Sequence, residues 1–216
     1  MVKEVFRCID TVRYLRAVQI YGRLWFMFYR PRPDSRPPPV CRVPLGERTP
    51  PVERPAMMTG CCRFRLLNVE REVKHAEDWD DPSMPALWRY HLHYFDDLNA
   101  EGAADRADWH LEALRWWLTE NPPGEGIGWD PYPTSLRIVN WVKWLQRPGI
   151  SGSDGIKAAD SALYSDVVTS LAVQARWLRK RLEHHLLGNH LLANAKALVF
   201  AGCFFQGPEA NRWRQR

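Results

Sequence analysis

The sequence is poor in the features that mark disulfide-rich and metal-binding proteins. It has five cysteines in 216 residues, an odd number, and no two of them form a Cys-x-x-Cys pair. This usage excludes a disulfide framework. His91 with His93, and His184 and His185 with His190, could share a metal, but no acidic residue or cysteine completes a familiar zinc spacing. We therefore predict neither a metal nor another cofactor.

Export and membrane signals are also lacking. The first residues lead into a polar, charged stretch without a small-residue cleavage site, so no signal peptide is predicted. The most apolar early run, residues 18–29, is too short to span a bilayer and carries Arg23. We interpret it as part of an amphipathic helix and expect no membrane span.

The charge balance is only mildly basic. A formal net charge of +5 and a pI near 9.1 favour acidic partners such as polyanionic sugars, nucleic acid or anionic lipid. The arginines are scattered, except between Arg30 and Arg36, where they alternate with proline. No polybasic stripe and no aromatic-rich RNA-binding motif is present, so we expect no nucleic-acid partner.

What the sequence does have is tryptophan, with 11 residues, and a hydrophobic fraction of 45%. A chain of this length and composition buries a real core. Tryptophan suits stacking on sugar rings and packing in large helical cores equally well. Composition alone leaves both roles open, although we expect most of the tryptophans to pack in the core.

Apolar periodicity predicts an all-α protein with one N-terminal helix, a proline-rich linker and a helical body. We divide the chain into residues 1–56, the helix and linker, and residues 57–216, antiparallel helical hairpins arranged in a ring or a solenoid. Residues 64–68 are short enough to be a strand or edge segment, and no element is expected after Gly207. Helices are expected at residues 5–29, 105–120, 134–145, 156–187 and 190–205.

The most informative stretch is EHHLLGNHLLANAKA, residues 183–197. Gly188 is placed where a left-handed residue would end one helix, and Asn189 could then cap the next. One interpretation is a well-formed corner between two helices. The other is that the Asn189 amide and the His190 imidazole are presented together to bind a carboxylate.

Three stretches together resemble a known family. They are LWRYHLHYFDDL at 87–98, GWDPYPTSLRIVNW at 128–141 and the stretch at 183–197, and in this order they are similar to the N-terminal helical domain of heparinase II/III polysaccharide lyases. Residues 11–33 resemble the leader of many members. The resemblance implies an incomplete (α/α) toroid followed by a β-sandwich domain, β-elimination on uronate-containing glycans, and a periplasmic or extracellular location.

The resemblance also implies site residues. In the family an asparagine, often beside a histidine, neutralises the uronate carboxylate, which implies catalytic roles for Asn189 and His190. Trp129, Tyr132 and Arg137 could line the sugar cleft, with Arg137 pairing with a carboxylate or sulfate. His93, Tyr94 and Asp96 could reach it from the first stretch. Each of these residues also has a structural alternative. Trp129 and Tyr132 could pack the loop, and Arg137 could bridge helix ends. His93, Tyr94 and Asp96 could form a buried polar cluster, and His190 could pack or cap a helix. Glu183 is expected to fix a helix end.

The family pattern is only partly present. The resemblance places the family's catalytic tyrosine and a further catalytic histidine beyond Arg216. We therefore expect a C-terminally truncated chain that lacks the rest of the toroid and the β-sandwich. We expect the enzyme to be inactive in this form. It should then expose apolar helix faces. The alternative function is a non-catalytic remnant that binds acidic glycans or serves as a scaffold. Heparin, other glycosaminoglycans, alginate-like and capsular polymers would all present a suitable carboxylate.

Overall fold

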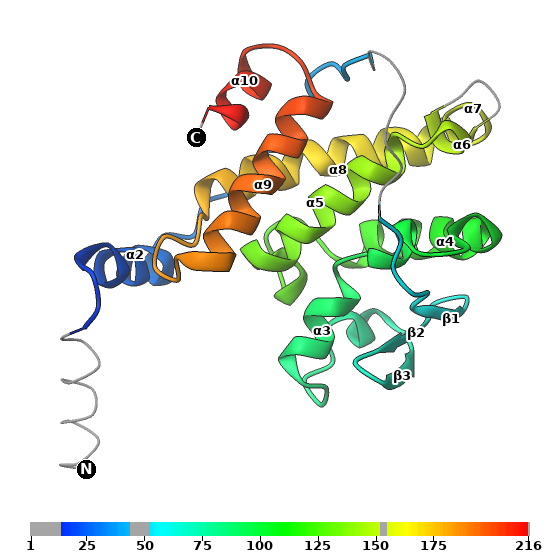
Figure 1. The fold of residues 1–216 in the computed structure, drawn as a ribbon, viewed down its shortest axis with the longest axis horizontal. Coiled ribbons are helices and arrows are strands. Elements are labelled where there is room, and N and C mark those ends of the chain that lie inside the picture. The colour runs from blue at the N-terminus through cyan, green and yellow to red at the C-terminus, as the bar shows by residue number, and fades with distance from the viewer. Residues whose placement is uncertain (1–13, 44–51, 152–154, 216) are drawn as a thin grey trace.

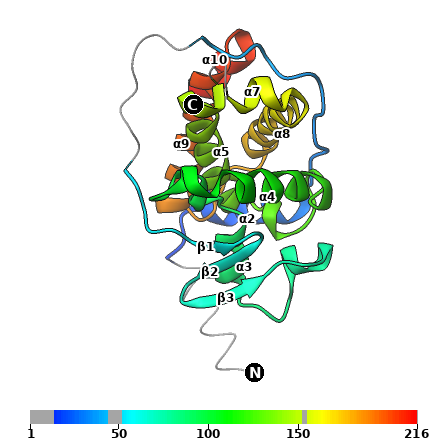
Figure 2. The same cartoon turned by 90° about the vertical axis from the view of Figure 1, so that its right-hand side faces the viewer.

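The computed structural model describes residues 14–43, 52–151 and 155–215. This part of the chain is largely helical, as predicted, and also contains one small antiparallel sheet (Figure 1). The sheet and the C-terminal helix lie at opposite ends of the molecule in both views (Figures 1 and 2). The helices between them form the body.

The N-terminal helix is shorter than predicted within the described residues. Helix α2 spans Ala17–Phe28, and the earlier part of the expected helix falls mostly outside the described residues. The proline-rich stretch that follows is extended, but it is held against the body. Arg176 donates hydrogen bonds to the carbonyls of Asp34, Arg36 and Pro37, and Cys41 forms a β-bridge with Phe205.

The sheet is a meander of β1 (Met58–Gly60), β2 (Arg63–Leu66) and β3 (Val69–Glu72). Strand β2 confirms the strand interpretation of residues 64–68, although it ends at Leu66. Phe64 and Leu66 are buried, whereas Arg63 and Arg65 face solvent and pair with glutamates of β3. This alternation gives the sheet one face for the core and one for water.

Five helices build the body: α3 (Ala86–Leu92), α4 (Ala107–Glu120), α5 (Pro131–Leu145), α8 (Ser161–Lys180) and α9 (Gly188–Phe204). Helix α5 packs against both α8 and α9, which also contact each other. Helix α4 packs on α8, and α3 lies near the sheet (Figure 2). Short helices and 3-10 turns connect them: η1 (Ala76–Asp80), η2 (Asp96–Asn99), η3 (Ala103–Arg106), η4 (Ile127–Trp129), α6 (Pro148–Ser151) and α7 (Ile156–Ala159).

Several predicted boundaries are wrong. The single helix expected at 156–187 is two, because Asp160 interrupts it and caps α8 by accepting from the Leu163 amide at 3.0 Å. Helix α8 then ends at Lys180. Helix α5 begins at Pro131, and Thr134 and Ser135 are buried inside it rather than capping it.

A further helix, α10 (Pro208–Arg214), follows Gly207, where no element was expected. It packs against α9 and buries Trp213 beside Phe205.

Most tryptophans pack in the core. Trp117 lies at its centre, with ring centroids 5.4 Å from Trp141 and 6.0 Å from Trp129. Trp25 of α2 is an exception, with 63% of its surface exposed. The high tryptophan content therefore reflects packing far more than a sugar-stacking surface.

Candidate functional site: a pocket beside Asn189

A pocket of about 490 Å³ lies where α3, α5 and the start of α9 meet. Tyr94, Tyr132 and Asn189, all predicted as site residues, line it together although they are far apart in sequence. Its size falls within the range of ligand-binding pockets. The remaining lining residues are Arg54, Leu87, His91, Asp96, Leu136, Leu192, Ala193 and Lys196.

Asn189 is presented at the N-terminal end of α9. Gly188 has the predicted left-handed backbone, with φ of +51°, but it is the first residue of α9 and lies well beyond the end of α8. Leu187 occupies the N-cap position without a side-chain cap, so Asn189 is not the cap. The Asn189 side chain is exposed and makes no hydrogen bond within the described part of the chain, which leaves its amide available to a ligand.

Two tyrosine rings form one wall of the pocket. Tyr94 and Tyr132 meet edge to face, with centroids 6.2 Å apart, and the His91 ring lies 4.8 Å from Tyr94. Burial, helped by Tyr132 and the negative charge of Asp96, raises the pKa of the Tyr94 hydroxyl. Tyr94, which is only 3% exposed, is therefore neutral at physiological pH.

The His190 ring packs against the Tyr132 ring, with centroids 4.5 Å apart. Its Nδ1 is 3.0 Å from Oε1 of Glu183, which is 5% exposed. With the carboxylate at Nδ1, we assign the proton of the neutral ring to that atom, which leaves the Nε2 lone pair free. Glu183 is thus an orienting group for His190, a role that sequence reasoning missed.

Glu183 is itself held by Asn194. Asn194 Nδ2 donates to Glu183 Oε2 at 3.0 Å and to Ser135 Oγ at 3.0 Å, and Asn194 Oδ1 accepts from the Glu183 amide at 2.9 Å. Burial raises the pKa of Glu183 although the bonds from Asn194 and His190 oppose it. The network ties the segment before α9 to both α9 and α5, and so fixes the imidazole beside the pocket.

The cationic groups of the pocket were not predicted. Arg54 is 3.2 Å from Asp96, whose other oxygen accepts from Asn140 Nδ2 at 2.8 Å. Lys196 of α9 lines both this pocket and a smaller one of about 70 Å³ that also contains Lys143. Burial and the nearby Lys196 charge lower the pKa of Lys143. The charges of Arg54 and Asp96 offset each other, so Lys196 gives the pocket the positive charge that favours an anionic ligand.

Three predicted site residues lie in the core. Arg137 is fully buried, with its guanidinium 4.1 Å from the centre of the Trp117 ring. It donates to the carbonyl of Gly128 at 2.7 Å and to Gln174 Oε1 at 2.9 Å. Trp129 is 2% exposed and donates its indole N–H to the Asn121 carbonyl. Trp129 thus packs the loop, whereas Arg137 joins η4 to the middle of α8 instead of bridging helix ends.

His93 is the third. Its Nδ1 accepts from Trp117 Nε1 at 2.9 Å, and its Nε2 lies 2.9 Å from the Trp79 carbonyl. Complete burial, with a smaller effect of Arg137, lowers the pKa of His93 to about 3, so the ring is neutral. It belongs to a buried polar cluster.

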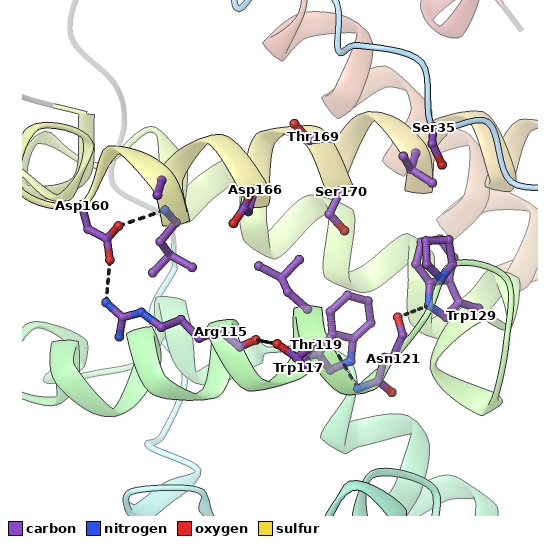
Figure 3. Close-up of a pocket in the computed structure, with 15 residues that line it drawn as sticks. Ser35, Arg115, Trp117, Thr119, Asn121, Trp129, Asp160, Asp166, Thr169 and Ser170 are labelled. Carbon is purple, nitrogen blue, oxygen red and sulfur yellow. Dashed lines mark hydrogen bonds and ion pairs between the residues drawn. The ribbon is translucent and has the colours of Figure 1, made fainter.

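A second cavity, of about 560 Å³, lies between α4 and α8 (Figure 3). Some of its polar groups bond to one another or to the backbone. Arg115 pairs with Asp160 at 2.6 Å, Thr119 donates to a backbone carbonyl, and Ser170 accepts from Gln174. Trp129 is the only predicted site residue that lines it. The pocket beside Asn189 is therefore the better candidate for function.

The part of the chain that the structure describes holds no group of three or more side chains suited to a metal ion. Within the same residues, no helix combines the length and apolar character needed to cross a membrane. Cys41, Cys61, Cys62 and Cys203 are free thiols.

No protein-family profile, curated protein or solved structure matches this chain.

Proposed function

We propose that this chain is the N-terminal helical part of a polysaccharide lyase, an incomplete (α/α) toroid, and that the pocket beside Asn189 binds the carboxylate of a uronic acid. The observation that carries the proposal is the free Asn189 amide in one pocket with Tyr132, Lys196 and Arg54. The resemblance of three sequence stretches to heparinase II/III lyases supports it independently.

The chemistry explains why such a pocket is needed. In β-elimination a base removes the C5 proton, the electrons form the C4–C5 double bond, and O4 departs with a proton from an acid. The C5 proton is barely acidic beside an ionised carboxylate. Donors that neutralise this carboxylate, here the Asn189 amide and the Lys196 ammonium, stabilise the negative charge that develops on it.

The surrounding groups would orient the sugar. The half-buried Tyr132 offers a ring face for the sugar and lies against His190. Glu183 holds His190 against Tyr132, although His190 itself does not line the pocket. The resemblance assigns the catalytic tyrosine and a further histidine to positions after Arg216, so we propose that these 216 residues bind the glycan without cleaving it.

The test is calorimetric titration with an oligouronate. Asn189→Ala should weaken binding about tenfold, since hydrogen bonds to charged groups contribute about 1.5–3 kcal/mol. Gln215→Ala removes an exposed amide just after α10, at the other end of α9, and should change nothing. Equal affinity for the wild type and Asn189→Ala would contradict the proposal.

An ultraviolet assay for the unsaturated product separates catalysis from binding. We expect no turnover by the 216-residue chain, and robust turnover would show that its base and acid are within it. The alternative function, a non-catalytic scaffold, predicts that neither the wild type nor any variant binds the oligouronate.

A further inference from the structure

A separate cavity of about 740 Å³ lies between α2, the loop at 123–130 and the end of α8. It shares no lining residue with the pocket beside Asn189. Its walls combine aromatic and proline side chains with an unusual number of positive groups. The basic residues are Arg23, Arg30, Arg32, Arg181 and His185, and the acidic ones are Glu125 and Asp130.

The fold itself gathers these arginines. Arg181, just after α8, donates to the carbonyls of Phe26 and Tyr29 at 2.7 and 2.6 Å, and its guanidinium lies 3.6 Å from the centre of the Phe26 ring. This satisfies carbonyls at the C-terminal end of α2 and fixes the helix to the body. A Cβ on Gly22 would lie only 3.1 Å from the His185 amide nitrogen, so α2 also approaches this segment closely.

The positive groups crowd one another. Burial lowers the pKa of His185, and Arg23 and Arg181 add to this effect. Burial also lowers the pKa of Arg181, where Asp130 and Glu183 oppose the shift and Arg30 adds to it. Asp130 is partly committed, because it accepts the Tyr90 hydroxyl at 2.7 Å. Like charges held this close repel one another unless an anion lies between them.

Donors also remain unused. Within the described residues, Arg23, Arg30 and Arg32 form no ion pair with a carboxylate. The buried Nε of Arg181 and the buried Nδ1 of His185 have no hydrogen-bond partner there either. The cavity therefore presents the guanidinium groups of Arg23, Arg30 and Arg32 without a carboxylate partner among the described residues.

We propose that this cavity is an anion-binding site for a tetrahedral oxyanion, a sulfate or phosphate group carried on a ring. Guanidinium groups match such oxyanions with paired hydrogen bonds. Trp177 and Pro33 give the carrier ring an apolar wall. Gly124, with φ of +83°, lets the loop close on them, since its Cβ would lie 3.0–3.2 Å from both.

The site does not depend on the proposed lyase function, and its test is separate. The intact chain is titrated with inorganic sulfate and inorganic phosphate, with tryptophan fluorescence and calorimetry as readouts. The double variant Arg23→Gln/Arg30→Gln should weaken oxyanion binding at least about tenfold. Both side chains are exposed, so the fold should persist, which circular dichroism checks.

Arg71→Gln, an exposed arginine of β3, is the matched control and should bind like the wild type. Asn189→Ala should also leave oxyanion binding unchanged, which separates this proposal from the previous one. If the chain binds one of the two ions more tightly, that ion shows whether the natural ligand carries a sulfate or a phosphate group. Binding of neither ion, or equal binding by the double variant and the wild type, would overturn the proposal.

Discussion

Buried polar residues account for much of the unusual chemistry of residues 87–98. Asp97 accepts hydrogen bonds from the amides of Met57 and Met58 and from the side chains of Arg106 and His110. Burial alone would raise the pKa of Asp97, but the bonds from His110 and Arg106 hold it well below its usual range. The carboxylate thus joins β1 to η2 and α4, so Asp97 has a structural role in the fold.

The buried His93 leads to a prediction about how the stability of the fold depends on pH. Its pKa is about 3 in the fold against 6.5 as a free side chain, so between these values the unfolded chain binds a proton that the folded chain excludes. Stability should therefore fall as pH drops below 6.5, by on the order of 5 kcal/mol at pH 3. Denaturant unfolding between pH 4 and 7 measures this.

The comparison variant is His93→Gln, which can still accept from Trp117 and donate to the Trp79 carbonyl. We expect it to be less stable at pH 7 but to lose less stability on acidification. An identical pH slope in the variant would mean that His93 is not the group responsible.

At the scale of elements, close approach of backbones decides how α10 meets α9. A Cβ on Gly202 would lie 2.7 Å from the Ala210 carbonyl oxygen and 3.2 Å from the Arg214 amide nitrogen. Real side chains do not tolerate the first distance, so one helix would have to move. Glycine at this position therefore allows α10 to bury Trp213 on the end of α9.

We predict that Gly202→Ala destabilises the protein by about 1–3 kcal/mol, the usual cost of overpacking, although alanine favours a helix. Gly149→Ala in α6 is the control, because nothing lies within 4 Å of its Cβ position. Thermal unfolding should show a lower midpoint for the first variant only. A rise in the midpoint for Gly202→Ala would show that α10 is not held there.

At the scale of the whole molecule, apolar surface remains uncovered. Helix α2 has no buried residue, and Tyr21, Trp25 and Phe28, at helical spacing, are 73%, 63% and 77% exposed. Leu192 of α9 is also exposed, at 68%. The stripe on α2 is not where the sequence-based expectation placed exposed apolar faces, and a stripe of this kind favours association.

We therefore predict concentration-dependent self-association of the chain, measured by sedimentation velocity. Tyr21→Ser/Phe28→Ser should weaken it about tenfold or more, because a buried aromatic ring contributes about 1.5–3 kcal/mol. Thr59→Ser, an exposed change in β1, is the control. A wild type that stays monomeric over the full concentration range would contradict the prediction.

The sequence by itself determined the helical class, the position of most helices and the left-handed Gly188, because apolar periodicity and glycine conformations are local properties. It also singled out Asn189, Tyr94 and Tyr132. It did not reveal that Asp160 splits a helix or that α10 follows Gly207. Those features depend on contacts between segments far apart in the chain, such as the ion pair of Asp160 with Arg115.

Only the tertiary structure decided which candidates share a pocket. Packing of α3 and α9 around α5 brings Asn189 to Tyr94 and Tyr132 and adds Arg54 and Lys196, which no local motif marks. The same packing places Arg137 and His93 in the core, where carbonyls and tryptophans satisfy them. A residue type and its spacing fix which chemistry is available, whereas burial fixes whether a ligand can reach it.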